Sequence, residues 1–169
     1  MCVADLTEGR KIMMYQNNAM KHILASHKAV TVSELALPLK NIMDGGFTFI
    51  DGMCFFKHMA GNVSKDGDMA LIKSRFGDCS GFENSINRIH VDFYIEEEII
   101  PQALALFDYM PHLWRGLNMP PAALVLGINI SPEFGEQAHL SFYLSRVGEE
   151  VVDWQNIDSY QSAIMLRLV

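Results

Sequence analysis

The chain has little cysteine, no long apolar run and no obvious export signal. Its three cysteines are Cys2, Cys54 and Cys79, an odd number without a CxxC pair. This argues against the disulfide framework of a small secreted domain and indicates reduced thiols. The first ten residues include two acids and no apolar segment, so they do not predict a signal peptide. No apolar stretch approaches the roughly 20 residues that cross a bilayer. The sequence therefore predicts a cytoplasmic protein without a membrane partner.

Positive charge is scarce in the C-terminal part of the chain. Residues 96–169 contain three basic and ten acidic residues, whereas residues 1–95 contain ten of each. The whole net charge of -7 therefore arises after residue 95, and no lysine follows Lys73. Because nucleic-acid affinity depends on basic side chains at the phosphates, this half offers no extended face for DNA or RNA.

The usual signatures of enzymes and metal sites are also missing. The chain has no GxxxxGK[ST] loop and no GxGxxG turn, and its glycines are scattered through contexts typical of turns. Among its six histidines, His22 and His27 are five residues apart, which does not place two ligands on one helix face. We therefore expect a protein that is not an enzyme and that has no cofactor and no metal.

Hydrophobic periodicity predicts both helices and strands. Two helices are expected, one near the N-terminus over 9–27 and a central one over 96–115. β-forming residues and alternation predict strands over 47–50, 53–56, 69–76, 86–95, 124–130 and 139–147, with a further strand at 151–157. The pattern does not decide between helix and strand for two segments, 29–44 and 158–169. For 158–169 a helix is favoured.

The connections between the expected strands are mostly too short for parallel crossovers. Short connections favour antiparallel pairing, because a parallel pair needs a long crossover. We therefore predict an α+β fold with mainly antiparallel sheets, formed by residues 1–169 as a single domain.

Two alternative functions have candidate residues. Residues 12–44 have a sequence pattern typical of a helix-turn-helix domain, which predicts a DNA-binding transcriptional regulator. However, the segment in the recognition position, 37–44, offers one lysine and a proline. Cys79 lies in a glycine-flanked segment with His90 on the next expected strand, so a Cys79-dependent hydrolase is the other alternative. The glycine-flanked segment is not a GxSxG elbow, which weighs against that chemistry.

A candidate protein-binding site lies in the acidic half. Acids border aromatic side chains in its expected loops, and such groups combine charge steering with an aromatic anchor. The candidate partner-binding residues are Glu133, Phe134, Glu136, Glu149, Glu150, Asp153 and Trp154.

Across most of its length the chain resembles the immunity proteins of bacterial contact-dependent growth inhibition systems. The resemblance rests on the small size, the acidic second half and the order of strands, the helix Glu96–Arg115 and further strands. That order is also similar to the Whirly-type arrangement of two four-stranded antiparallel sheets. The resemblance implies a protein that neutralises a cognate toxin domain, of the basic nuclease type, by occluding its active site.

Overall fold

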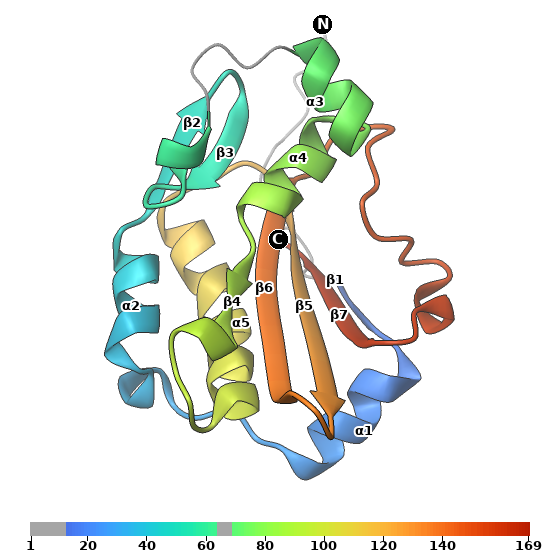
Figure 1. The fold of residues 1–169 in the computed structure, drawn as a ribbon. Helices are drawn as coiled ribbons and strands as arrows, with labels where there is room; N and C mark the ends of the chain where they lie inside the picture. The colour runs from blue at the N-terminus through green and yellow to red at the C-terminus, as the bar shows by residue number, and fades with distance from the viewer. Residues whose placement is uncertain (1–12, 64–68) are drawn as a thin grey trace, which may run out of the picture.

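The computed structural model describes residues 13–63 and 69–169 (Figure 1). The strands are β1 (Met13–Gln16), β2 (Phe47–Ile50), β3 (Met53–Phe56), β4 (Ile89–His90), β5 (Ala122–Ser131), β6 (Gly135–Leu144) and β7 (Ala163–Leu168). The α-helices are α1 (Asn18–Ser26), α2 (Leu37–Asp44), α3 (Met69–Phe76), α4 (Cys79–Ile86) and α5 (Ile99–Gly116). Short 3-10 helices are η1 (Val32–Glu34), η2 (Ala60–Asn62), η3 (Val91–Phe93) and η4 (Ile157–Ser159).

The strands form two antiparallel sheets, which confirms the predicted α+β fold class. The larger sheet has five strands in the order β1-β7-β5-β6-β4, and the smaller one is the hairpin of β2 and β3. The long strands β5 and β6 form the centre of the larger sheet and are joined by a tight turn (Figure 1). Since the sheets have five and two strands, the Whirly-type pair of four-stranded sheets is not the arrangement found.

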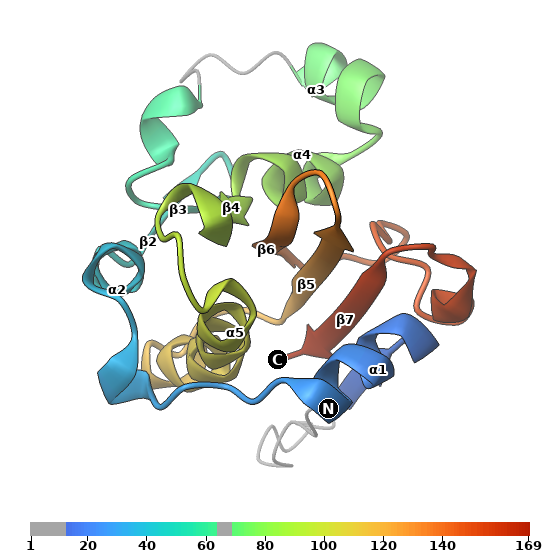
Figure 2. The same cartoon turned by 60° about the horizontal axis from the view of Figure 1, so that its bottom comes forward.

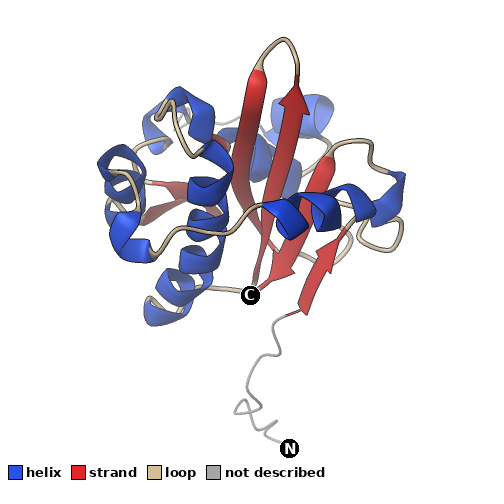
Figure 3. Cartoon of the chain, turned by 90° about the horizontal axis from the view of Figure 1, so that it is seen from below, coloured by secondary structure: helices blue, strands red, loops and turns tan. Residues whose placement is uncertain are grey.

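The main core lies between α5 and one face of the large sheet. Leu124 and Leu126 of β5 and Phe142 of β6 face the helix, where they meet side chains such as Phe107 and Trp114. The Trp114 indole packs edge-on against Phe142, with the ring centroids 5.1 Å apart. Figure 3 shows helices beside the strands on this side, others behind the strands, and α1 alongside the strand that ends at the C-terminus, β7.

The opposite face of the sheet is covered over part of its length by the segment that connects β6 to β7. Val125, Tyr143 and Leu166 point to this face and pack against Val152 and Ile157 of that segment. Successive strand residues therefore alternate between two apolar layers, which explains why β5 reads as a nearly continuous apolar run.

The N-terminal helix is shorter than predicted because a strand precedes it. The predicted helix 9–27 is α1 only from Asn18, since Asn17 Oδ1 accepts a hydrogen bond from Met20 N and caps the helix there. Met13–Gln16 instead pair with β7. Residues 9–12 lie outside the described residues.

Two predicted strands in the middle of the chain are wrong. Residues 69–76 form α3, in agreement with their content of Met, Ala, Leu, Lys and Arg, which favour helices. Of the predicted strand 86–95 only Ile89 and His90 pair with β6, because the 3-10 helix η3 follows immediately. The central helix is confirmed as α5, although it begins at Ile99 and continues through Pro111.

The open segments are now assigned. Within 29–44, η1 is followed by α2, whose first turn holds Pro38 without loss of a helical hydrogen bond. Residues 163–168 form the strand β7, so the favoured helix at 158–169 is wrong: pairing with both β1 and β5 outweighs its helical pattern. No strand forms over 151–157, where the chain instead covers the sheet.

Candidate functional site

The seven predicted partner-binding residues fall into two groups at opposite ends of β6. Glu133, Phe134 and Glu136 lie at the turn from β5 to β6, whereas 149–154 follow the other end of β6. A ten-residue strand is about 30 Å long, so one contiguous patch cannot contain both groups.

The first group is exposed at the end of the β5–β6 hairpin. The Phe134 side chain is 65% exposed, and its backbone N donates to Ser131 Oγ at 3.0 Å, which holds the turn. Glu136 lies 3.6 Å from His27 Nε2, at the end of α1. The aromatic ring therefore stands in solvent on a defined turn.

A second exposed aromatic segment, which the sequence pattern does not predict, lies at the same end of the sheet. Phe93 is 78% exposed, and its ring stacks on that of His90 with a centroid distance of 4.9 Å. The neighbouring Asp92 accepts a hydrogen bond from Ala138 N at 3.2 Å, which ties the segment to the start of β6. The signal was present as Phe93-Tyr94 before three glutamates, but it was divided between a predicted strand and a helix start.

These two segments together form what we call the acidic-aromatic end. Its members are exposed or half-exposed side chains at the hairpin turn and before α5: Phe93, Tyr94, Glu96, Glu97, Glu98, Glu133, Phe134 and Glu136. Figure 1 shows the β5–β6 turn, the segment before α5 and the first turn of α5 at the lower end of the molecule.

The second predicted group is engaged in contacts within the protein. Glu149 Oε2 accepts hydrogen bonds from Ser80 N and Oγ, and Trp154 packs on Tyr15 with ring centroids 4.8 Å apart. Asp153 accepts a hydrogen bond from Asn156 Nδ2. These residues therefore stabilise the covering segment, with the exposed Glu150 beside a small groove under Trp154.

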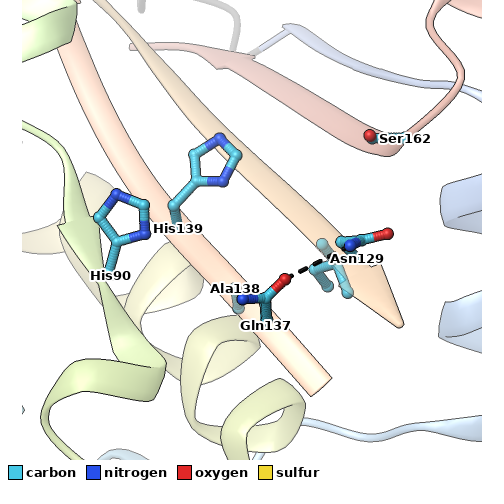
Figure 4. Close-up of a pocket in the computed structure, with 7 residues that line it drawn as sticks. His90, Asn129, Gln137, Ala138, His139 and Ser162 are labelled. Carbon is cyan, nitrogen blue, oxygen red and sulfur yellow. Dashed lines mark hydrogen bonds between the residues drawn. The ribbon is translucent and has the colours of Figure 1, made fainter. Parts of the chain in front are cut away.

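A pocket of about 130 Å³ opens on the face of the sheet away from α5, near the acidic-aromatic end. Figure 4 shows His90 and His139 side by side on β4 and β6, with Asn129, Gln137 and Ser162 across the pocket. Burial lowers the pKa of His139 to about 4, with smaller contributions from the charges of Arg88 and His90. His139 is therefore a neutral imidazole near pH 7.

Residues 13–44 do not form the three-helix arrangement that the helix-turn-helix interpretation requires. Residues 13–16 are a strand, and ten residues, 27–36, separate α1 from α2 instead of a short turn. Figures 1 and 2 both place α1 and α2 on opposite sides of the molecule. Leu39, Ile42 and Met43 of α2 are buried in the core, and its exposed side carries Lys40 and Asp44.

Cys79 lacks the electrostatic environment of a thiol nucleophile. It is the first residue of α4, after the N-cap Asp78. Burial raises the pKa of the Cys79 thiol, and the nearby Glu149 adds to this. A catalytic cysteine needs a lowered pKa, because the thiolate is the reactive form.

Within 13–63 and 69–169, no group of three or more His, Cys, Asp or Glu side chains is arranged to hold a metal ion. Over the same part of the chain, no helix has both the length and the apolar character needed to span a membrane.

Comparison with known proteins gives a family but no activity. No solved structure matches the chain. A protein of Pasteurella multocida (strain Pm70), the uncharacterized protein PM0498, is 26% identical over 160 residues, covering 93% of this chain and 99% of that protein. The model of the uncharacterized protein PM0498 family matches residues 15–168, nearly the whole described fold, and the chain therefore belongs to that family.

Proposed function

We propose that this protein is an immunity protein, which binds a basic toxin domain and neutralises it by covering the toxin's active site. The observation that carries the proposal is the acidic-aromatic end, where Phe93 and Phe134 stand 78% and 65% exposed among glutamates. Large exposed aromatic side chains are costly in water unless a partner covers them, and they are frequent anchors of protein interfaces.

The charges at this end favour a basic partner. Its members include five glutamates and no lysine or arginine. Complementary charge mainly raises the association rate and makes it sensitive to salt, while the aromatic rings supply the buried contact that slows dissociation. A nuclease groove is a suitable target, because it holds cationic side chains for the phosphates.

In this proposal the protein acts in the cytoplasm by stoichiometric binding and carries out no reaction itself. It needs no cofactor, and its specificity for one toxin comes from the shape and charge of the docking surface. No observation on the helix-turn-helix or the Cys79 alternative supports a competing function to the same degree.

The direct test uses the purified protein encoded by the neighbouring open reading frame, which the proposal expects to be the toxin. Association and dissociation are measured at about 50 mM and 300 mM salt, together with growth of cells that produce the toxin domain. The informative variants are a charge reversal, Glu96→Lys with Glu97→Lys, and an aromatic truncation, Phe93→Ala with Phe134→Ala. We expect the first to slow association by about tenfold or more at low salt and the second to speed dissociation.

A matched control lies at the other end of β6. Glu150→Lys reverses an exposed charge at that end of the same molecule and is compared with Glu97→Lys alone. The proposal predicts little change in binding for this variant and continued protection of the cells. Equal effects of both charge reversals, or a neighbouring protein that is not bound at all, would overturn it.

A further inference from the structure

His90 and His139 are directly opposite each other on neighbouring antiparallel strands, β4 and β6. Their partners along the strands, Ile89 and Leu140, enter the core beside α5, so the two imidazoles project from the other face of the sheet. Their ring centroids are 6.0 Å apart and their planes meet at 41°. Because sheet hydrogen bonds fix opposite Cβ atoms about 4.5–5.5 Å apart, the backbone itself sets this spacing.

The neighbouring strand leaves room for these rings. Gly127 of β5 lies opposite His139, and a Cβ on Gly127 would come within 2.2 Å of His139 Cε1. The absence of a side chain at Gly127 thus gives the imidazole its place over β5. The adjoining pocket is open to solvent and bordered by Asn129, Gln137 and Ser162, which leaves space for bound water.

From this geometry we infer that His90 and His139 form a two-histidine site for a divalent late-transition ion, of the class of Zn²⁺, Ni²⁺ and Cu²⁺. Imidazole is a preferred ligand of these ions. With metal–nitrogen bonds of about 2.0–2.1 Å, two rings on one tetrahedral ion have centroids about 5 Å apart. The present separation of 6.0 Å is about 1 Å larger, so binding requires a rotation of the His139 side chain about χ1.

Binding also orients the rings. Figure 4 shows the nitrogens of His139 on the ring edge turned away from His90, so the ring makes a half turn about its Cβ–Cγ bond when the ion binds. The stacking of Phe93 on His90, at 4.9 Å and 21° between planes, holds the other ring in place. Such supporting contacts commonly set the orientation of histidine ligands.

The site is a weak, exchangeable one and not a structural metal centre. The protein supplies two ligands and water fills the other positions, since no group of three ligands forms among the described residues. This binding does not depend on the proposed function, and it is tested on the isolated protein.

The test is a titration of the full chain, prepared without a histidine tag, with Ni²⁺ or Zn²⁺ in a calorimeter. We expect one ion per chain, and His90→Gln or His139→Gln to weaken binding by at least about tenfold. The matched control is His22→Gln, which removes an exposed histidine of α1 and is expected to change the affinity less than twofold. Unchanged binding in both His90→Gln and His139→Gln would overturn the assignment.

A second measurement uses the unmodified protein and does not depend on how the variants fold. In histidine-selective NMR with Zn²⁺, the imidazole signals of His90 and His139 should shift together, before those of the other four histidines. Shifts confined to the other histidines, or no shift of any histidine, would contradict the site.

Discussion

Arg146 donates two hydrogen bonds to the fully buried carboxylate of Glu83, of 2.7 Å to Oε2 and 2.9 Å to Oε1. The same carboxylate accepts from Cys54 N of β3 at 2.7 Å and from Leu144 N at the end of β6 at 2.9 Å. One side chain of α4 therefore joins the small hairpin, the large sheet and the covering segment. The hydrogen bonds to Glu83 also raise the pKa of Arg146, which stays charged.

This pair predicts a large loss of stability when one member is removed. Glu83→Ala removes the charged partner of a partly buried guanidinium and the acceptor of two backbone N–H groups, and breaking a buried pair costs about 3–5 kcal/mol. Asp108→Ala is the control, because it removes the more exposed partner of Arg167 and should cost about 1 kcal/mol or less. Urea unfolding of both variants measures the difference in the free energy of unfolding. Comparable losses of stability would show that Glu83 contributes no more than an exposed ion-pair partner.

The hydrogen bonds of Asn17 predict a second effect on stability. They allow the capping of α1 to be separated from the attachment of α1 to the segment before β7. Its Oδ1 caps α1, while its Nδ2 donates to Tyr160 O and Ser162 O before β7. Aspartate caps as well as asparagine but cannot donate, so Asn17→Asp should cost about 2–4 kcal/mol through the two lost donors and a buried charge.

The control for Asn17 is Asp78→Asn at the start of α4. Asp78 Oδ1 accepts from Gly81 N, a role that asparagine fills equally well. We expect a change within about 0.5 kcal/mol for this variant, measured by the same unfolding experiment. An equally small loss for Asn17→Asp would mean that the donors to Tyr160 O and Ser162 O contribute little.

Which parts of the fold could be predicted follows from where the stabilising contacts lie. α5 and the β5–β6 hairpin are long elements whose periodicity is visible locally, and both were predicted. By contrast α4 and its C-cap bury the polar side chains Ser80, Glu83, Asn84 and Asn87 at helical spacing. A pattern search for apolar stripes overlooks such a face, because its partners lie on β3 and β6, far away in the chain.

The candidate site was predictable in composition but not in arrangement. Glu133 and Phe134 were identified from acids beside an aromatic residue, and the turn does expose them. Phe93 was missed because alternation placed it in a strand, whereas η3 turns its ring out of the sheet. Trp154 lies beside acids as Phe134 does, but its ring packs on Tyr15, a residue 139 positions earlier that no local pattern connects to it.

The close fit between Gly127 and the His139 ring predicts that substitutions at the two positions have strongly non-additive effects on stability. Gly127→Ala places a Cβ 2.2–2.5 Å from the His139 ring, so we expect a loss of about 1–3 kcal/mol from overpacking. In His139→Ala the ring is gone, and the same Gly127→Ala change should become neutral or stabilising, since alanine suits a strand better than glycine. A double-mutant cycle measures this, and additive effects would contradict the close approach.

The environment of Cys79 predicts that its thiol reacts slowly with alkylating reagents. Because its pKa is raised by burial and by Glu149, the thiolate fraction near pH 8 is smaller than that of free cysteine, and iodoacetamide should label it more slowly. Cys54 is fully buried, and burial raises its pKa to about 12, so it should resist labelling until the protein unfolds. Mass spectrometry of a Cys2→Ser chain follows both sites, and Glu149→Gln should raise the rate at Cys79 modestly. Labelling of Cys79 faster than free cysteine would reveal an activated thiol and return the hydrolase to consideration.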